Sequence, residues 1–189
     1  GYANEEIAET AYEQIKTLSY AHLFLDKGSE ISVKLAEKLK KMVPGNFSKV
    51  FFGLSGSDAN DTQIKLIRYY NNVIGRPEKK KIIGRVKGYH GIAGAAASAT
   101  GGEAYHRGFD LPVQGFYHTD CPHYYRNSEK GETEDQFTTR LAANLESLIL
   151  KEGADTVAAF IAEPIMGAGG VIVPPDSYFE KIQKVLKKY

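Results

Sequence analysis

Small polar residues at the end of an apolar run have the composition of a phosphate-binding loop. Residues 49–52 predict a buried strand, and Ser55, Gly56 and Ser57 follow it just before a helix predicted over residues 59–72. Free amides and the positive dipole end of a helix favour an anion, glycine admits close approach, and serine adds hydroxyl donors. Many helices that bind nothing begin in the same way, because serine is also a common helix cap. The spacing therefore indicates a phosphate site or an ordinary capped helix.

Two further predicted strand ends carry side chains suited to an aromatic ring. Tyr89 and His90 follow a strand predicted over residues 81–86, and Glu163 follows an apolar strand predicted over residues 156–162. An aromatic side chain can stack on a ring face, and a carboxylate can organise a polar ring edge. Taken singly, Tyr89 also fits a core aromatic and Glu163 a solvated strand end. Their conjunction with the serine-glycine loop favours a site for a phosphorylated aromatic ring.

Helical and strand patterns alternate along the chain. Apolar residues recur at helical spacing over residues 4–18, 31–42, 59–72, 133–153 and 177–186, and strands are predicted at residues 49–52, 81–86, 111–119 and 156–162. Thr133 with Gln136, and Ser177 with Glu180, form capping-box patterns that open the last two helices. This alternation is typical of an α/β fold with a mostly parallel sheet and flanking helices, which binds ligands at the carboxyl ends of its strands.

Composition and charge exclude several classes of partner. The 189 residues carry 24 basic and 23 acidic side chains, giving a net charge of +1 without a basic patch. The single cysteine, Cys121, excludes an internal disulfide and is typical of a reducing compartment. No apolar run approaches transmembrane length, and the amino end has no secretory signal pattern. We therefore expect a cytoplasmic protein with no metal site, no nucleic-acid partner and no membrane partner.

Three motifs in chain order resemble the class III (omega-amino acid type) pyridoxal-phosphate aminotransferases. They are SGSDAND at residues 55–61, GYHG at residues 88–91 and FIAEPIMGAGGVIVPP at residues 160–175. The resemblance covers residues 1–189. It implies the large domain of a fold-type I transferase, which moves an amino group from an amino donor to a keto acid with pyridoxal 5'-phosphate as cofactor. It also implies an obligate homodimer with active sites at the subunit interface.

The resemblance assigns roles to residues by motif position. The implied cofactor-binding residues are Ser55, Gly56, Ser57, Tyr89, His90 and Glu163. The loop residues would bind the cofactor phosphate, Tyr89 would stack on the pyridine ring, and His90 would support it. Glu163 would help position the aspartate that pairs with the ring nitrogen. In the family this aspartate and the Schiff-base lysine come later, so no catalytic residue is expected before Tyr189.

Three positions depart from common family patterns. Asp58 stands where glutamate is common, and Met166 stands where glutamine often follows E-P-I, but neither removes an implied cofactor contact. Ala168 stands where relatives that use 2-oxoglutarate carry a glutamate, which pairs with a mobile substrate-binding arginine. The sequence therefore resembles the amine:pyruvate branch. We expect pyruvate as acceptor, with an omega-amino acid or a primary amine as donor.

The family pattern also predicts the domain organisation. Residues 1–46 would form an amino-terminal helical segment, and residues 47–189 the first part of the cofactor-binding large domain. Since the remaining strands, the lysine and the small domain would follow, we expect a truncated chain that is inactive alone. Two classes stay open: the amino-terminal portion of a catalytic aminotransferase, and a non-catalytic fragment that keeps the phosphate loop and dimer surface. A class III aminomutase or decarboxylase relative is an alternative within the family.

Overall fold

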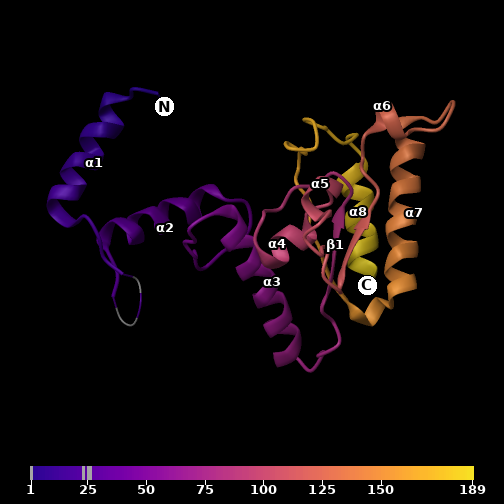
Figure 1. The fold of residues 1–189 in the computed structure, drawn as a ribbon, viewed down its shortest axis with the longest axis horizontal. Coiled ribbons are helices and arrows are strands. Elements are labelled where there is room, and N and C mark those ends of the chain that lie inside the picture. Colours follow the sequence, from indigo (N-terminus) through magenta and orange to yellow (C-terminus); the bar gives the residue numbers. More distant parts are fainter. Residues whose placement is uncertain (1, 23, 25–26) are drawn as a thin grey trace. The chain divides into compact units, whose positions relative to one another are not determined.

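The computed structural model describes residues 2–22, 24 and 27–189, and the chain divides into two compact units, Gly1–Phe52 and Gly53–Tyr189 (Figure 1). The first unit contains α1 (Glu5–Leu18) and α2 (Glu30–Met42), which confirms both helices predicted there. Residues 1, 23, 25 and 26 of the predicted helical segment lie outside the described residues. No helix in the described part of the chain has both the length and the apolar character needed to cross a membrane.

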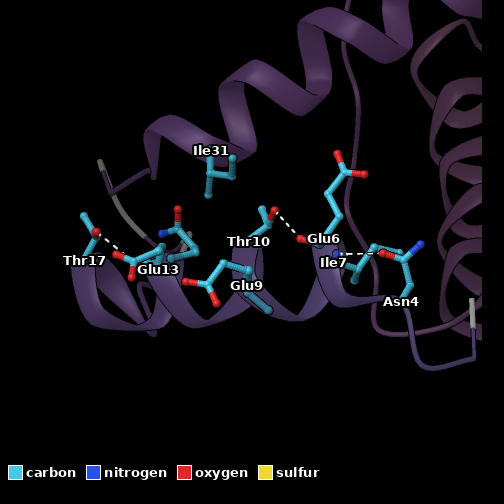
Figure 2. A pocket seen from close by; sticks show the side chains of 10 residues that line it. Asn4, Glu6, Ile7, Glu9, Thr10, Glu13, Thr17 and Ile31 are labelled. Carbon is cyan, nitrogen blue, oxygen red and sulfur yellow. Dashed lines mark hydrogen bonds between the residues drawn. The ribbon is translucent and has the colours of Figure 1, made fainter.

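The first unit exposes the apolar residues of both helices. No residue of α1 or α2 is buried, and Ile7 and Ile15 of α1 are 61% and 62% exposed. A groove runs along α1 and is closed on one side by Ile31 of α2 (Figure 2). Its lining contains none of the predicted cofactor-binding residues. The amphipathic pattern therefore predicts these two helices correctly, but not a buried face within this unit.

The second unit is a parallel sheet covered on both faces by helices. In chain order its elements are α3 (Gly56–Val73), β1 (Lys81–Arg85), α4 (Gly94–Ala99), α5 (Glu103–His106), β2 (Phe116–Thr119), α6 (Tyr124–Asn127), α7 (Glu134–Glu152), the 3-10 turn η1 (Ala154–Thr156), β3 (Val157–Phe160) and α8 (Tyr178–Lys188). β2 and β3 both pair in parallel with β1, so the strand order is β2-β1-β3. The expected α/β class with a parallel sheet is confirmed.

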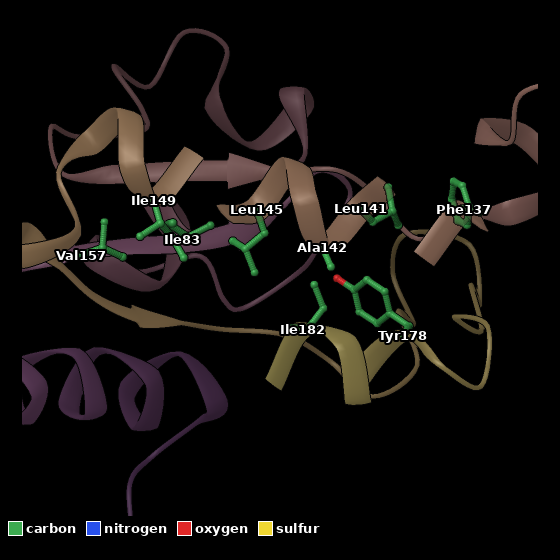
Figure 3. Close-up of a cluster of buried hydrophobic side chains, with 9 residues drawn as sticks. All are labelled: Ile83, Phe137, Leu141, Ala142, Leu145, Ile149, Val157, Tyr178 and Ile182. Atoms are coloured by element: carbon green, nitrogen blue, oxygen red, sulfur yellow. The ribbon is translucent and has the colours of Figure 1, made fainter. Parts of the chain in front are cut away.

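Neighbouring residues of β1 place their side chains on opposite faces of the sheet. Ile82 packs with Ile64 of α3 and Phe116 of β2 on one face. Ile83 enters the larger cluster, formed with α7, β3 and α8 on the other face (Figure 3). Phe137, Leu145 and Ile182 of that cluster are at most 1% exposed. Because β1 is buried on both faces, its carboxyl end is a firm support for the residues that follow it.

The capping box predicted at the start of α7 is present. The Thr133 hydroxyl accepts a hydrogen bond from the Gln136 amide, and the Gln136 side chain accepts one from the Thr133 amide. The second predicted box is wrong, because Ser177 makes no side-chain cap to α8. Its hydroxyl instead hydrogen-bonds Thr138 of α7 at 2.7 Å. The serine therefore joins two helices instead of capping one.

Other predicted boundaries need correction. Residues 49–52 form no strand, and Phe51 is 65% exposed. Both edges of β1 are occupied by β2 and β3, and no described strand pairs with this apolar run. The strand predicted over residues 111–119 is present only as β2, and the low-bulk run at residues 91–102 contains α4, which was not predicted. The helix predicted over residues 59–72 is confirmed as α3, which begins three residues earlier.

Candidate functional site

The amino end of α3 is open and has free donors. Ser55 caps it, since its hydroxyl accepts a hydrogen bond from the Asp58 amide at 3.2 Å. Among the described residues, the amides of Gly56 and Ser57 donate no hydrogen bond. A Cβ atom added to Gly56 would meet nothing within 4 Å. Two free amides, a helix of 18 residues and unobstructed space suit an anion such as a phosphate.

The Asp58 carboxylate is turned away from these amides. Its Oδ2 accepts a hydrogen bond from the Leu54 amide at 3.0 Å. A Cβ atom on Gly53 would lie 2.7 Å from the same oxygen, so the carboxylate sits against the loop backbone. The side chain at this position therefore closes the loop before the helix. Its negative charge is therefore placed against the Leu54 amide and not against the free amides of Gly56 and Ser57.

The loop that carries Tyr89 and His90 is bonded directly to α3. The Ser57 hydroxyl accepts a hydrogen bond from the Ile92 amide at 3.1 Å, and the Asn60 side chain donates to the His90 carbonyl at 2.7 Å. Gly91 has φ +135°, and a Cβ atom there would lie 2.6 Å from the Ser57 hydroxyl. The structure thus brings the phosphate-loop serine and the Tyr89-His90 pair together. It does so through these hydrogen bonds from α3, because the strand predicted over residues 49–52 does not form.

Two residues that sequence reasoning missed complete this attachment. Thr100 is fully buried, and its hydroxyl accepts from the His90 amide at 2.9 Å and donates to the Gly91 carbonyl at 3.0 Å. Asp61 accepts from the Ala96 amide at 2.6 Å, fixing the start of α4. Asn60 and Asp61 lie three and four residues after Ser57, so they share one face of α3. That helical spacing was the available signal for Asp61; Thr100 had none.

Glu163 joins the carboxyl ends of β1 and β3. Its Oε1 accepts a hydrogen bond from the Tyr89 amide and its Oε2 accepts one from the Gly167 amide, both at 2.9 Å. The Tyr89 ring is partly exposed and lies 5.5 Å from the Tyr105 ring, measured between centroids. The structure therefore brings Ser57, Tyr89, His90 and Glu163 into one hydrogen-bonded group. Ser55 stays outside that group, as the cap of α3.

The turn after Glu163 is fixed at both ends. Met166 is fully buried, and its backbone exchanges two hydrogen bonds of 3.0 Å with Ile172. Gly167 is held by the Glu163 carboxylate. Ala168 lies exposed between these anchors. A side chain at position 168 would therefore project from a turn whose backbone is already held.

Burial keeps His90 uncharged at neutral pH. Removal from water lowers the pKa of His90 to about 4; the Glu163 carboxylate opposes this shift, and the Arg85 and His118 charges add to it. Burial also lowers the pKa of His118, whose ring nitrogen lies 3.2 Å from the Ala99 carbonyl. His90 is therefore a neutral imidazole at physiological pH, with hydrogen-bonding capacity and no charge.

The depressed pKa of His90 predicts a pH-dependent stability. A histidine in the unfolded chain has a pKa near 6.5, whereas folded His90 has a pKa of about 4. Between these two pH values the unfolded state binds a proton at His90 and the folded state does not. The stability contributed by neutral His90 is complete above pH 6.5 and decreases as the pH falls toward 4. We expect the stability advantage of the wild type over His90→Gln to shrink by up to about 2 kcal/mol between pH 7.5 and pH 5.

Denaturant unfolding of the cofactor-free protein at both pH values measures this difference without a contribution from ligand binding. An advantage that stays constant over this range would mean that His90 titrates alike in the folded and unfolded states.

The family model for "Aminotransferase class-III" matches residues 1–189. The diaminobutyrate–2-oxoglutarate transaminase of Halomonas elongata is 49% identical over 100% of this chain, and gamma aminobutyrate transaminase 1 of Solanum lycopersicum is 55% identical over 97%. The chain covers 41% and 36% of their respective lengths, so it spans about two-fifths of the curated relatives that it matches.

Solved structures show the same arrangement. An omega transaminase from Pseudomonas jessenii in complex with PMP superimposes with a TM-score of 0.98 at 56% identity, over 100% of this chain and 42% of that chain. A structure described as a transaminase with L-ala gives a TM-score of 0.98 at 53% identity, over 100% of this chain and 45% of that chain. The parallel sheet and its flanking helices are therefore those of the transaminases.

Proposed function

Because this chain belongs to the class III aminotransferase family, we propose that the protein carrying it transfers an amino group from an omega-amino acid or a primary amine to a keto acid. The family depends on pyridoxal phosphate. The observation that supports the proposal best is the open end of α3, where two unpaired amides lie beside the loop bearing Tyr89 and His90. A phosphate and an aromatic ring are the two parts of the cofactor that such a site would hold.

We assign each residue a role in holding the cofactor. The amides of Gly56 and Ser57 bind the phosphate, and Ser55 keeps the helix end ordered as its cap. Tyr89 offers its ring face to the pyridine ring, with His90 as a neutral support. When bound, the cofactor supplies the electron sink for amino transfer.

Glu163 acts through the backbone in this proposal. By accepting from the Tyr89 and Gly167 amides it fixes the loop that bears Tyr89 and the turn that bears Ala168. The family's ring-nitrogen aspartate and catalytic lysine would come from outside residues 1–189. The lysine is the group that would move a proton at the substrate carbon. The residues of this chain therefore bind and orient, and leave proton transfer to the rest of the protein.

We propose pyruvate as the preferred acceptor. Ala168 places no carboxylate on the held turn after Glu163, so an arginine in the site would lack the partner that holds it aside in users of 2-oxoglutarate. Pyruvate carries one carboxylate and 2-oxoglutarate carries two, so pyruvate requires fewer charged partners in the site. The similar structure described with L-alanine, the amino form of pyruvate, supports this choice. The Halomonas relative, named for 2-oxoglutarate, favours the other acceptor.

The test compares the two acceptors directly. We expect kcat/KM for pyruvate to exceed that for 2-oxoglutarate by about tenfold or more with one saturating amine donor, equivalent to about 1.4 kcal/mol. Ala168→Glu should narrow this ratio, because it restores a carboxylate to the turn. A higher kcat/KM for 2-oxoglutarate in the wild type would reject the pyruvate assignment while leaving amino transfer intact. Failure of amino transfer with every donor and acceptor pair would reject the function itself.

Assembly and location complete the proposal. We propose a homodimer with its active sites at the subunit interface, in the cytoplasm, where the buried free thiol of Cys121 stays reduced. The alternatives are a non-catalytic fragment that keeps the phosphate loop and dimer surface, and a class III aminomutase or decarboxylase. The intact mass of the purified protein separates the first alternative from an enzyme. A mass near 20.8 kDa would favour the fragment.

A further inference from the structure

A fully buried arginine ends the central strand of the sheet. Arg85 is the last residue of β1, and its side chain has no exposed surface. Its Nη2 donates a hydrogen bond to the main-chain carbonyl of Glu163. Its Nε and Nη1 are also buried, and neither has a hydrogen-bond partner among the described residues. One of its three nitrogens is therefore satisfied and two are not.

Two aromatic rings of α8 lie against the guanidinium, and neither side chain completes a hydrogen bond to Nε or Nη1. The guanidinium carbon lies 5.8 Å from the centre of the Tyr178 ring and 5.9 Å from that of Phe179, both on α8. Such contacts stabilise a cation over a ring face, but the N–H groups in the guanidinium plane still need acceptors. The Tyr178 hydroxyl is close enough to Arg85 for the guanidinium to oppose the rise that burial causes in the pKa of Tyr178, but it lies outside hydrogen-bond geometry to any group in the described part of the chain. The unsatisfied polar groups thus come from both β1 and α8.

The nearby carboxylates are engaged elsewhere. Both oxygens of Glu163 accept backbone amides, and Asp120 accepts from the Asn144 side chain at 2.7 Å. No carboxylate in the described ranges forms an ion pair with Arg85. A buried charge is costly unless it is both paired and hydrogen-bonded, and an unpaired buried donor is costly by itself. A complete protein would therefore be expected to bring an anionic acceptor to this arginine.

The sheet offers a place from which such an acceptor could enter. β3 pairs only with β1 among the described strands. Beside β3 lies a cavity of about 250 Å³, whose apolar lining includes Ile83, Phe160 and Leu186. The relatives that match this chain are more than twice as long. Additional chain packed along β3 would reach the carboxyl edge of the sheet next to Glu163 and Arg85.

We propose that Arg85 is the receptor for a carboxylate contributed by a part of the same protein chain outside residues 1–189. The carboxylate accepts hydrogen bonds from Nε or Nη1, and the Glu163 carbonyl keeps Nη2. Because Glu163 also fixes the Tyr89 amide, the contact links the candidate site to the remainder of the protein. The carboxylate contact to Arg85 would be the same whichever substrate the protein uses.

A crystal structure of the full-length protein, at a resolution that shows ordered water, tests the contact directly. We expect a carboxylate oxygen from outside residues 1–189 within about 3.2 Å of Arg85 Nε or Nη1. Acceptors that are only waters or main-chain carbonyls would overturn the proposal. A carboxylate from a second copy of the chain would also overturn it, because the proposal commits to the same chain.

Variants of the full-length protein test the charge pairing energetically. Arg85→Met removes the charge and leaves a shorter, unbranched apolar side chain. We expect it to lower Tm by about 10 °C, because the partner carboxylate is left buried and unpaired. Tyr178→Phe removes a buried hydroxyl at the same place without changing charge and should lower Tm by about 3 °C or less. Changing the carboxylate seen in the crystal to its amide should restore part of the Tm lost in Arg85→Met. A double variant no more stable than Arg85→Met would contradict a charge pair.

Discussion

Replacing Gly91 with alanine is expected to destabilise the protein by about 3 kcal/mol or more. The Gly91 backbone has φ +135°, a conformation that L side chains rarely adopt. The added Cβ atom would lie 2.6 Å from the Ser57 hydroxyl and 2.9 Å from both the Ser57 Cα and the Ala96 Cβ. Two of these neighbours belong to α3 and one to α4, so relief requires moving a helix. Since the same contact holds the Tyr89 loop to the phosphate loop, cofactor retention should fall with stability.

Two other glycines separate backbone strain from the steric clash. Gly108 has φ +78° with nothing within 4 Å of an added Cβ atom, so Gly108→Ala should cost about 1 kcal/mol from strain alone. Gly56 has neither a positive φ nor a close neighbour, so Gly56→Ala should leave stability nearly unchanged. Denaturant unfolding of the three variants measures the series. Equal losses at Gly91 and Gly108 would show that the loop yields and that the clash is unimportant.

Replacing Glu163 with alanine is expected to cost about 3 kcal/mol. The carboxylate accepts hydrogen bonds from the Tyr89 and Gly167 amides, and bonds to a charged group contribute about 1.5–3 kcal/mol each. The lower end of that range applies because Glu163 is only partly buried. Glu163→Gln keeps one accepting oxygen and places an amide donor against the other N–H group. Its loss should be about half that of the alanine variant.

The measurements are the unfolding free energy and the dissociation constant of the cofactor. The unfolding free energy should fall and the dissociation constant should rise together, because the hydrogen bond to the Tyr89 amide positions the Tyr89 ring, which we propose stacks on the cofactor. Glu180→Ala is the matched control. Among the described residues its exposed carboxylate pairs only with exposed Lys184, so the change should stay within about 0.5 kcal/mol. A glutamine variant as damaging as the alanine variant would mean that the negative charge, and not the two hydrogen bonds, is what matters.

The sequence predicted the elements whose apolar periodicity is strong. α7 follows from its capping box and its recurring apolar residues, which include Phe137, Leu141 and Leu145, and β1 follows from a short apolar run between turn signals. The run at residues 49–52 looks equally strand-like but has no partner, and pairing is a tertiary property that a local pattern does not contain. α4 was missed because its six residues are glycine, alanine and serine, which show no amphipathic period.

The candidate site likewise contains some residues that local sequence patterns predict and others that only the folded structure brings in. Tyr89, His90 and Glu163 follow strands that the sequence predicts and the structure contains, and parallel strands bring their carboxyl ends together. Ser57 reaches them from the start of α3, because the strand predicted before it does not form. Their partners were not predictable from spacing, since Thr100 is one of many threonines until the fold places its hydroxyl between the His90 amide and the Gly91 carbonyl. Both oxygens of Glu163 accept hydrogen bonds from backbone amides. Because every residue except proline has a backbone amide, the amino-acid sequence does not indicate which ones Glu163 would contact.

The position of β1 between β2 and β3 also determines when the sheet can form while the protein is being synthesised. Glu163 bonds to Arg85 and Tyr89, which precede it by 78 and 74 residues. At about 5–20 residues per second, a ribosome needs roughly 4–15 seconds to reach Glu163 after making these residues. Throughout that interval β1 lacks β3, and the Arg85 side chain has neither its carbonyl acceptor nor the rings of α8. The nascent chain therefore exposes the apolar residues of β1 until β3 has been made and can pair with it.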